Sequence, residues 1–122
     1  MSRGVLLFGH GARDPLWATP FHAVAARVKA MNPGVQVELA FLELMSPDLN
    51  GGADVLVEAG CSQICIVPLF LGTGGHVRGD LPRLLDHLRL RHPKVKWTLQ
   101  AAVGEHRDVI EAMARVAGES LA

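Results

Sequence analysis

Four strand-like apolar segments alternate along this chain with four segments of helical pattern, and this alternation most limits its possible folds. Because parallel strands must be joined by crossover connections, strands that alternate with helices favour a parallel sheet covered by helices. The strands are expected at 5–8, 35–41, 64–67 and 95–99.

Two kinds of strand pattern predict the order of the strands in the sheet. Segments 5–8 and 64–67 are continuous apolar runs, as expected of central strands covered on both faces. Segments 35–41 and 95–99 alternate apolar and polar residues, so we expect them at the edges. With right-handed crossovers, the order becomes 2-1-3-4. The prediction is an α/β fold: one open four-stranded parallel sheet with helices on both faces, in a single domain spanning residues 1–122.

Capping residues predict where the helices begin. Asp14-Pro15 and Ser46-Pro47 each combine a capping side chain with a proline that suits the first helical turn. Asp80-Leu81-Pro82 is expected to open the third helix, which leaves Gly72–His76 as a loop. The fourth helix is expected after Gly104.

Composition excludes some classes of function. The formal net charge of this 122-residue chain is zero, so no global field attracts nucleic acid or an anionic membrane. The first apolar run is too short for a membrane span or a secretory signal. Cys61 and Cys65, expected on a loop and in a buried strand, are interpreted as reduced thiols of a cytoplasmic protein.

Two histidines follow the two central strands within glycine-bearing loops. His10 lies in Gly9-His10-Gly11, and His76 ends the Gly72–His76 stretch. In the order 2-1-3-4, the strand order reverses between strands one and three, where open α/β sheets bind ligands. We therefore expect His10 and His76 to face one ligand. Neutral imidazole binds divalent transition metals and can accept a proton near neutral pH.

Glu43 is expected on the same rim, just after the second strand. It can be a solvated carboxylate, a proton acceptor, or a third ligand beside the two imidazoles. Arginines in the neighbouring loops would suit carboxylates or phosphates; these are Arg13, Arg78 and Arg107. The remaining histidines are expected to be solvent-exposed on helices or at their ends: His22, His87, His92 and His106.

A phosphate site is the competing interpretation of the glycine loops. Neither Gly-x-Gly-x-x-Gly nor a P-loop with Lys-Ser/Thr is present. The segment from His10 to Pro15 partly matches the Arg-His-Gly-x-Arg-x-Pro signature of histidine phosphatases, but Gly9 stands at the leading arginine. A phosphoryl-transfer enzyme with His10 as nucleophile is therefore a secondary alternative.

The motifs together resemble the CbiX family of small sirohydrochlorin chelatases, which are class II chelatases. The resemblance covers essentially the whole chain, and only Leu81 departs conservatively, from an expected isoleucine. It is carried by Gly9-His10-Gly11 with Arg13-Asp14, Phe41-Leu42-Glu43 with Pro47, Pro68-Leu69-Phe70-Leu71, Gly75-His76-Val77, Asp80-Leu81-Pro82 and Gly104.

This resemblance implies a chelatase-like, flavodoxin-like half that inserts a divalent metal into sirohydrochlorin. His10 and His76 would bind the metal, Glu43 would assist, and no organic cofactor is expected. Cobalt is the first choice of metal, with iron or nickel as alternatives. The glycine loop and Arg13 would contact the tetrapyrrole; the loop residues are Gly72, Thr73, Gly74 and Gly75.

The short chain suggests a homodimer, since larger class II chelatases resemble two such halves in one chain. A non-catalytic carrier of tetrapyrrole or metal is the main alternative to an enzyme.

Overall fold

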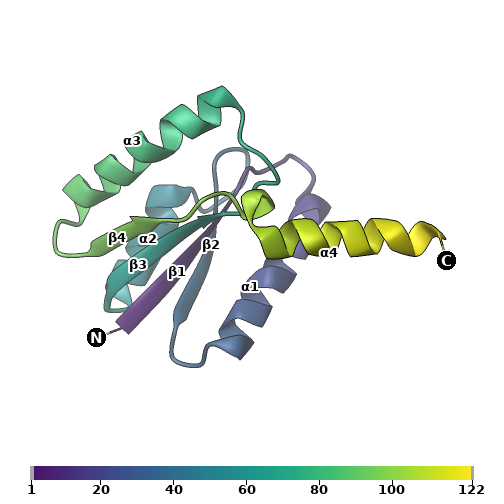
Figure 1. The fold of residues 1–122 in the computed structure, drawn as a ribbon. Coiled ribbons are helices and arrows are strands. Elements are labelled where there is room, and N and C mark those ends of the chain that lie inside the picture. Colours follow the sequence, from purple (N-terminus) through teal and green to yellow (C-terminus); the bar gives the residue numbers. More distant parts are fainter. Residues whose placement is uncertain (1, 122) are drawn as a thin grey trace.

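A computed structural model of the chain describes residues 2–121, with the side chain of His76 outside the description. It contains one parallel sheet in the order β2-β1-β3-β4, shown in Figure 1. The predicted fold class and strand order are thus confirmed. The strands are β1 (Ser2–Gly9), β2 (Gln36–Phe41), β3 (Cys61–Pro68) and β4 (Lys96–Leu99).

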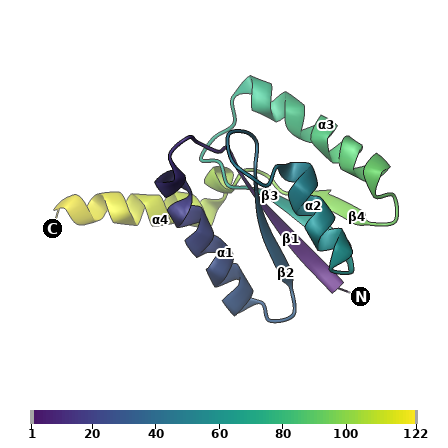
Figure 2. The same ribbon diagram turned by 180° about the vertical axis from the view of Figure 1, so that it is seen from behind.

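Helices cover both faces of this sheet, but unequally. α2 and α3 pack on one face and α1 on the other, while α4 runs away from the sheet (Figures 1 and 2). Within residues 2–121, no helix has both the length and the apolar character that crossing a membrane requires. The helices are α1 (Thr19–Met31), α2 (Leu49–Glu58), α3 (Gly75–Arg91) and α4 (Arg107–Gly118), and the short 3-10 turns are η1 (Pro15–Ala18), η2 (Val103–Glu105) and η3 (Glu119–Leu121).

The core has two parts, because side chains of a strand alternate between the faces of the sheet. Phe8 and Ile64 point to the α2–α3 side, where they meet Leu56 and Leu88. Leu7 is buried on the other side, with the residues packed under α1. The apolar stripe predicted for α3 is confirmed, since Leu81, Leu84, Leu85 and Leu88 all belong to the first part of the core.

Two predicted helix starts are wrong, and the first helix is divided. Asp14 caps the 3-10 turn η1, and α1 follows only at Thr19. The cap of α2 is Asp48, whose side chain accepts a hydrogen bond from the Gly51 amide at 2.8 Å, so the predicted cap at Ser46 is wrong.

α3 begins at Gly75 instead of Asp80, with Gly74 as its N-cap. Val77 and Leu81, four residues apart, both pack on the core. A helix that starts early buries both side chains on one face. His76 therefore belongs to the first turn of α3 and not to a loop.

The two cysteines also differ from expectation. Cys61 is the first residue of β3 and is buried, whereas Cys65, in the same strand, is only half-buried.

At the amino end of the sheet, Asp54 joins α2 to the end of α3. Arg91 donates to both Asp54 oxygens, at 2.9 and 2.6 Å, and His92 Nε2 lies 2.7 Å from Oδ1. His92 is thus a half-buried partner, and its predicted solvent exposure is wrong; His22, His87 and His106 are exposed as predicted. Hydrogen bonds from Arg91 first, and from His92, lower the pKa of Asp54 from 3.8 to about 2.

Asp54→Asn is expected to lower the free energy of unfolding by about 1 kcal/mol near neutral pH, since the pair is bidentate but partly exposed. Because the pKa of Asp54 is lowered by folding, the carboxylate stabilises the fold fully at pH values above the ordinary pKa of 3.8. This stabilisation is lost as the pH falls from there toward about 2. The difference between wild type and variant should therefore shrink over that interval in urea titrations. Asp86→Asn, which breaks a more exposed pair with Arg89, is the control. An equal loss in both variants would contradict the role of Asp54.

Candidate functional site

His10 and Glu43 form a pair at the carboxyl ends of the neighbouring strands β1 and β2. His10 Nε2 lies 3.1 Å from Glu43 Oε1, and the two side chains are 50% and 55% exposed. When Nε2 carries the proton it donates to the carboxylate, so the other ring nitrogen, Nδ1, presents a lone pair. The pair is accessible to a ligand and combines a metal-binding group with a proton acceptor.

The backbone holds this pair together. The Leu42 amide donates to the Gly9 carbonyl at 2.9 Å, and the Glu43 amide donates to the His10 carbonyl at 3.1 Å. Gly11 has a φ of +95°, and a Cβ placed there would lie 1.8 Å from the Glu43 carbonyl oxygen. Only glycine fits this combination of left-handed backbone and close approach. The loops after β1 and β2 are therefore fixed against each other.

Phe70 supports His10 from the segment that follows β3. The two rings meet edge-on with their centroids 6.2 Å apart, and Phe70 in turn packs at 5.9 Å from Phe8. Phe70 is buried, so it restricts the position of the exposed imidazole. Sequence reasoning missed this role, although an aromatic side chain two residues before the first glycine of the loop was a usable signal.

The glycine loop after β3 is open. A Cβ at Gly72, Gly74 or Gly75 would meet no atom within 4 Å, so a flat ligand could approach this backbone closely. The carbonyl of the half-buried Thr73 accepts a hydrogen bond from Arg78 at 3.0 Å.

Gly104 fixes the start of this loop. A Cβ at Gly104 would lie 1.8 Å from the Leu71 carbonyl oxygen, and the Gly104 amide donates to the Phe70 carbonyl at 2.9 Å. The turn after β4 is thus packed directly on the segment that leads into the glycines.

The structure brings together some of the predicted residues and not others. His10 and Glu43 are paired; the side chain of His76 lies outside the described part, so its predicted contact with the ligand stays a prediction. Arg13 is exposed in the loop after β1. Arg78 and Arg107 lie in the first turns of α3 and α4, so their predicted loop placement is wrong.

A complete metal site is not visible in the described side chains. Among them, which exclude that of His76, no three His, Cys, Asp or Glu side chains are grouped to hold a metal ion.

Comparison with known proteins assigns this chain to a family. A sequence model of the CbiX family matches residues 4–120. The chain belongs to the CbiX family. Among curated relatives, the sirohydrochlorin ferrochelatase of Bacillus subtilis is 29% identical over 93% of this chain, which corresponds to 43% of that protein. The sirohydrochlorin cobaltochelatase of Saccharolobus solfataricus is 30% identical over 96% of this chain and 94% of its own length.

Two solved CbiX-type folds superpose closely on this family member. A putative cobalamin biosynthesis CbiX protein from Marinobacter aquaeolei matches with a TM-score of 0.84 and 28% identity, over 98% of this chain and 97% of its own. The sirohydrochlorin chelatase SirB from Bacillus subtilis subspecies spizizenii, solved in complex with cobalt, matches with a TM-score of 0.82 and 28% identity. That match covers 94% of this chain and 49% of SirB, so this chain spans about half of that relative.

Proposed function

We propose that this CbiX-family chain is an enzyme, a chelatase that inserts a divalent metal ion into sirohydrochlorin. The observation that carries the proposal is the accessible pair of His10 and Glu43 beside an open glycine loop, at the carboxyl ends of the strands. Sirohydrochlorin is also the substrate in the names of its relatives, both those more than twice as long as this chain and one of similar length.

The reaction requires a metal to be presented while pyrrole N–H protons leave the ring. His10 holds the incoming ion through a ring nitrogen, and His76, from the first turn of α3, is proposed as the second ligand. A site with few protein ligands leaves coordination positions for the ring nitrogens. Glu43 accepts a proton that leaves the ring, since its carboxylate lies within hydrogen-bond distance of the imidazole that holds the metal.

The proposed ring site lies against the loop of residues 72–75. Side chains are small or absent there, so the macrocycle can approach the backbone and bend out of plane. Sirohydrochlorin carries several carboxylates, and Arg13 is an exposed cation on the same edge of the sheet. Local positive charge thus compensates for the zero net charge of the chain.

Cobalt is the proposed metal, with Fe²⁺ or Ni²⁺ as alternatives. Imidazole and carboxylate ligands suit all three ions, so the donor set does not select among them. Relatives are named as both cobaltochelatases and ferrochelatases. We also propose that the chain works as a homodimer in the cytoplasm, because one half-sized domain encloses a macrocycle poorly and both cysteines are free.

Anaerobic absorption spectroscopy tests this proposal. Mixing the protein with sirohydrochlorin and Co²⁺, Fe²⁺ or Ni²⁺ should convert the free-ring spectrum to that of the metal complex faster than the ion alone does. No acceleration with any of the three ions would overturn the proposed activity. A phosphatase with His10 as nucleophile would instead hydrolyse a phosphomonoester.

A further inference from the structure

Two exposed leucines flank His10 at the carboxyl end of the sheet. Leu44 directly follows Glu43, whose carboxylate lies 3.1 Å from the His10 ring, and it is 59% exposed. Leu71 directly follows Phe70, whose ring meets the same imidazole at a centroid distance of 6.2 Å, and it is 69% exposed. Two side-chain neighbours of His10 are thus each followed by a large apolar residue that is open to solvent.

Leu44 is held in a strained turn. Its φ is +66°, and the Met45 amide donates a hydrogen bond across it to the Glu43 carbonyl at 2.8 Å. These two features are those of a γ-turn of the strained kind, in which glycine or asparagine is the more usual central residue. Residues held in such conformations are concentrated at ligand sites. A leucine with this backbone and an exposed side chain therefore indicates a contact made with a ligand.

The backbone of Leu71 is fixed in a different way. Gly104 packs on the Leu71 carbonyl, where a Cβ would lie 1.8 Å from the oxygen, and the Gly104 amide donates to the Phe70 carbonyl at 2.9 Å. The next residue, Gly72, begins the open loop, in which a Cβ would meet no atom within 4 Å. Both leucines are thus carried on fixed backbone, so little ordering of the main chain is needed when they meet a ligand.

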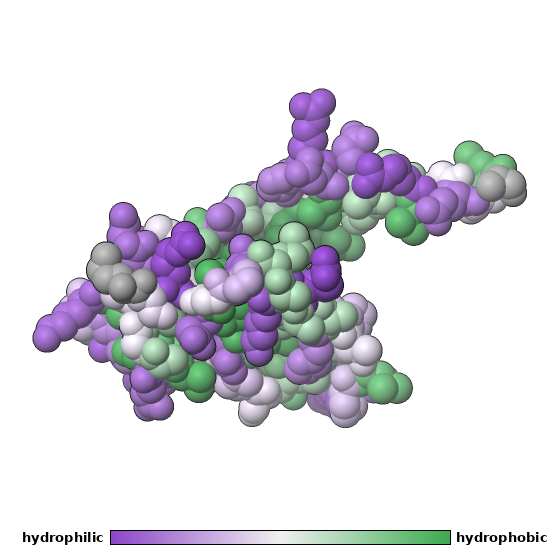
Figure 3. Space-filling model, turned by 90° about the horizontal axis from the view of Figure 1, so that it is seen from below, coloured by the Kyte–Doolittle hydropathy of each residue, from purple (hydrophilic) through white to green (hydrophobic). Residues whose placement is uncertain are grey.

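Exposed apolar side chains elsewhere have a different setting. Several lie on α4, and Figure 3 shows apolar residues on the inner side of this projecting helix where it leaves the body. Single apolar residues on a protein surface are common and need no ligand. Leu44 and Leu71 differ from these, because each directly follows a residue whose side chain contacts His10.

We propose that Leu44 and Leu71 are substrate-binding residues, which hold an apolar face of the tetrapyrrole beside the His10 imidazole. A tetrapyrrole has flat, largely apolar faces and carries its carboxylates at the periphery. Apolar side chains next to the proposed metal ligand, with the exposed cation of Arg13 on the same edge of the sheet, match these two kinds of surface. This inference rests on the proposed function and names two residues that bind its substrate.

The two leucines should act on ring binding more than on the chemical step. A leucine side chain has no atom that binds a metal ion or accepts a proton, so its contact with the ring is similar before and during insertion. Losing such a contact should raise KM for the ring and leave kcat within about threefold of wild type. Losing His10 should instead lower kcat, which separates the two kinds of residue.

Leu44→Asn and Leu71→Asn test the contact, because asparagine resembles leucine in shape but is polar and tolerates a positive φ. The probe is metal-free sirohydrochlorin, titrated anaerobically into each protein and followed by absorption. We expect the Kd of the ring to rise at least about tenfold in each variant, as the loss of a buried leucine contact predicts. Leu44→Met and Leu71→Met, which keep an apolar side chain of similar size, should bind the ring within about twofold of wild type.

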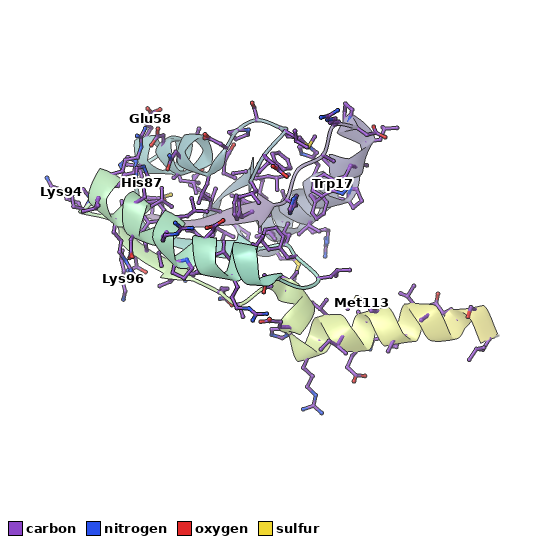
Figure 4. The ribbon with its side chains drawn as sticks, turned by 90° about the horizontal axis from the view of Figure 1, so that it is seen from above. Trp17, Glu58, His87, Lys94, Lys96 and Met113 are labelled. Carbon is purple, nitrogen blue, oxygen red and sulfur yellow. The ribbon has the colours of Figure 1, made fainter. Side chains whose placement is uncertain are left out.

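Leu90→Asn is the matched control, since Leu90 is 82% exposed near the end of α3. Figure 4 shows His87, three residues before it, at the other end of the body from Trp17, which follows the loop after β1. Leu90→Asn should leave the Kd of the ring unchanged. Urea denaturation should show Leu44→Asn to be no less stable than wild type, because the exchange relieves strain and removes an exposed side chain.

The outcomes separate this inference from the proposed function. Wild-type protein that inserts metal, with both asparagine variants binding the ring as tightly as wild type, would overturn the contact and leave the chelatase standing. Wild-type protein that does not bind the ring would overturn both. If the asparagine variants instead weaken a dimer in sedimentation experiments and keep their affinity for the ring, the leucines bind a second copy and the inference is wrong.

Discussion

Replacing His10 with alanine is expected to slow metal insertion by at least about 100-fold, because the variant loses both the proposed metal ligand and the partner of the proposed proton acceptor. Glu43→Gln should retain the hydrogen bond but not the charge, and we expect a loss of about 10- to 100-fold. The measurement is the initial rate of metallation at fixed metal concentration, with circular dichroism to verify folding.

His22→Ala is the control for the loss of an imidazole, since His22 is exposed on α1 and not in the loops after β1, β2 or β3. It should keep the wild-type rate. A His10→Ala variant that is folded and inserts metal at the wild-type rate would show that the crevice is not the site. His76→Ala should resemble His10→Ala if His76 is the second ligand, and a phosphatase mechanism would require only His10.

Replacing Gly11 with alanine is expected to lower the free energy of unfolding by about 3 kcal/mol and to remove activity as well. The positive φ alone costs about 1–2 kcal/mol for a residue with a Cβ. The added methyl group would overlap the Glu43 carbonyl oxygen at 1.8 Å, so the loops after β1 and β2 must move apart. This movement separates Glu43 from His10.

Gly34→Ala separates the two causes. Gly34 has a φ of +90°, similar to that of Gly11, but a Cβ there would meet no atom within 4 Å. We expect it to cost about 1 kcal/mol in urea denaturation and to leave the metallation rate unchanged. Equal losses of stability in both variants would mean that the contact with Glu43 adds nothing.

The fold was predictable because the apolar pattern within each strand segment indicates whether that strand is central or at an edge of the sheet. Continuous apolar runs mark β1 and β3, and alternation marks β2 and β4. The predicted burial on both faces is right for most of β1 but wrong for β3, where only alternate residues are buried. The strand order then placed His10 and Glu43 on one edge before any contact was known. Their hydrogen bond shows that the two side chains meet there, while their roles toward a ligand stay a prediction.

The remaining differences have identifiable physical causes. The start of α3 was mispredicted because Gly74 caps without a side chain, while Asp80-Leu81-Pro82 imitates a helix start. The direction of α4 was not predictable, because its apolar side is compatible with burial against its own sheet or another copy's. Cys65 is more exposed than its strand pattern indicates, because α4 has its main contacts with η2 and η3 and not with the sheet.

The measurement that tests the central claim most directly is the number of metallated rings formed per chain. Sirohydrochlorin and Co²⁺, or in parallel Fe²⁺ or Ni²⁺, are supplied anaerobically in large excess over the protein, and the product is followed by absorption. The account predicts many turnovers per chain with at least one ion, at a rate that His10→Ala abolishes. Product that stops at about one ring per chain, or that forms no faster than with the ion alone, would contradict an enzyme and favour a carrier.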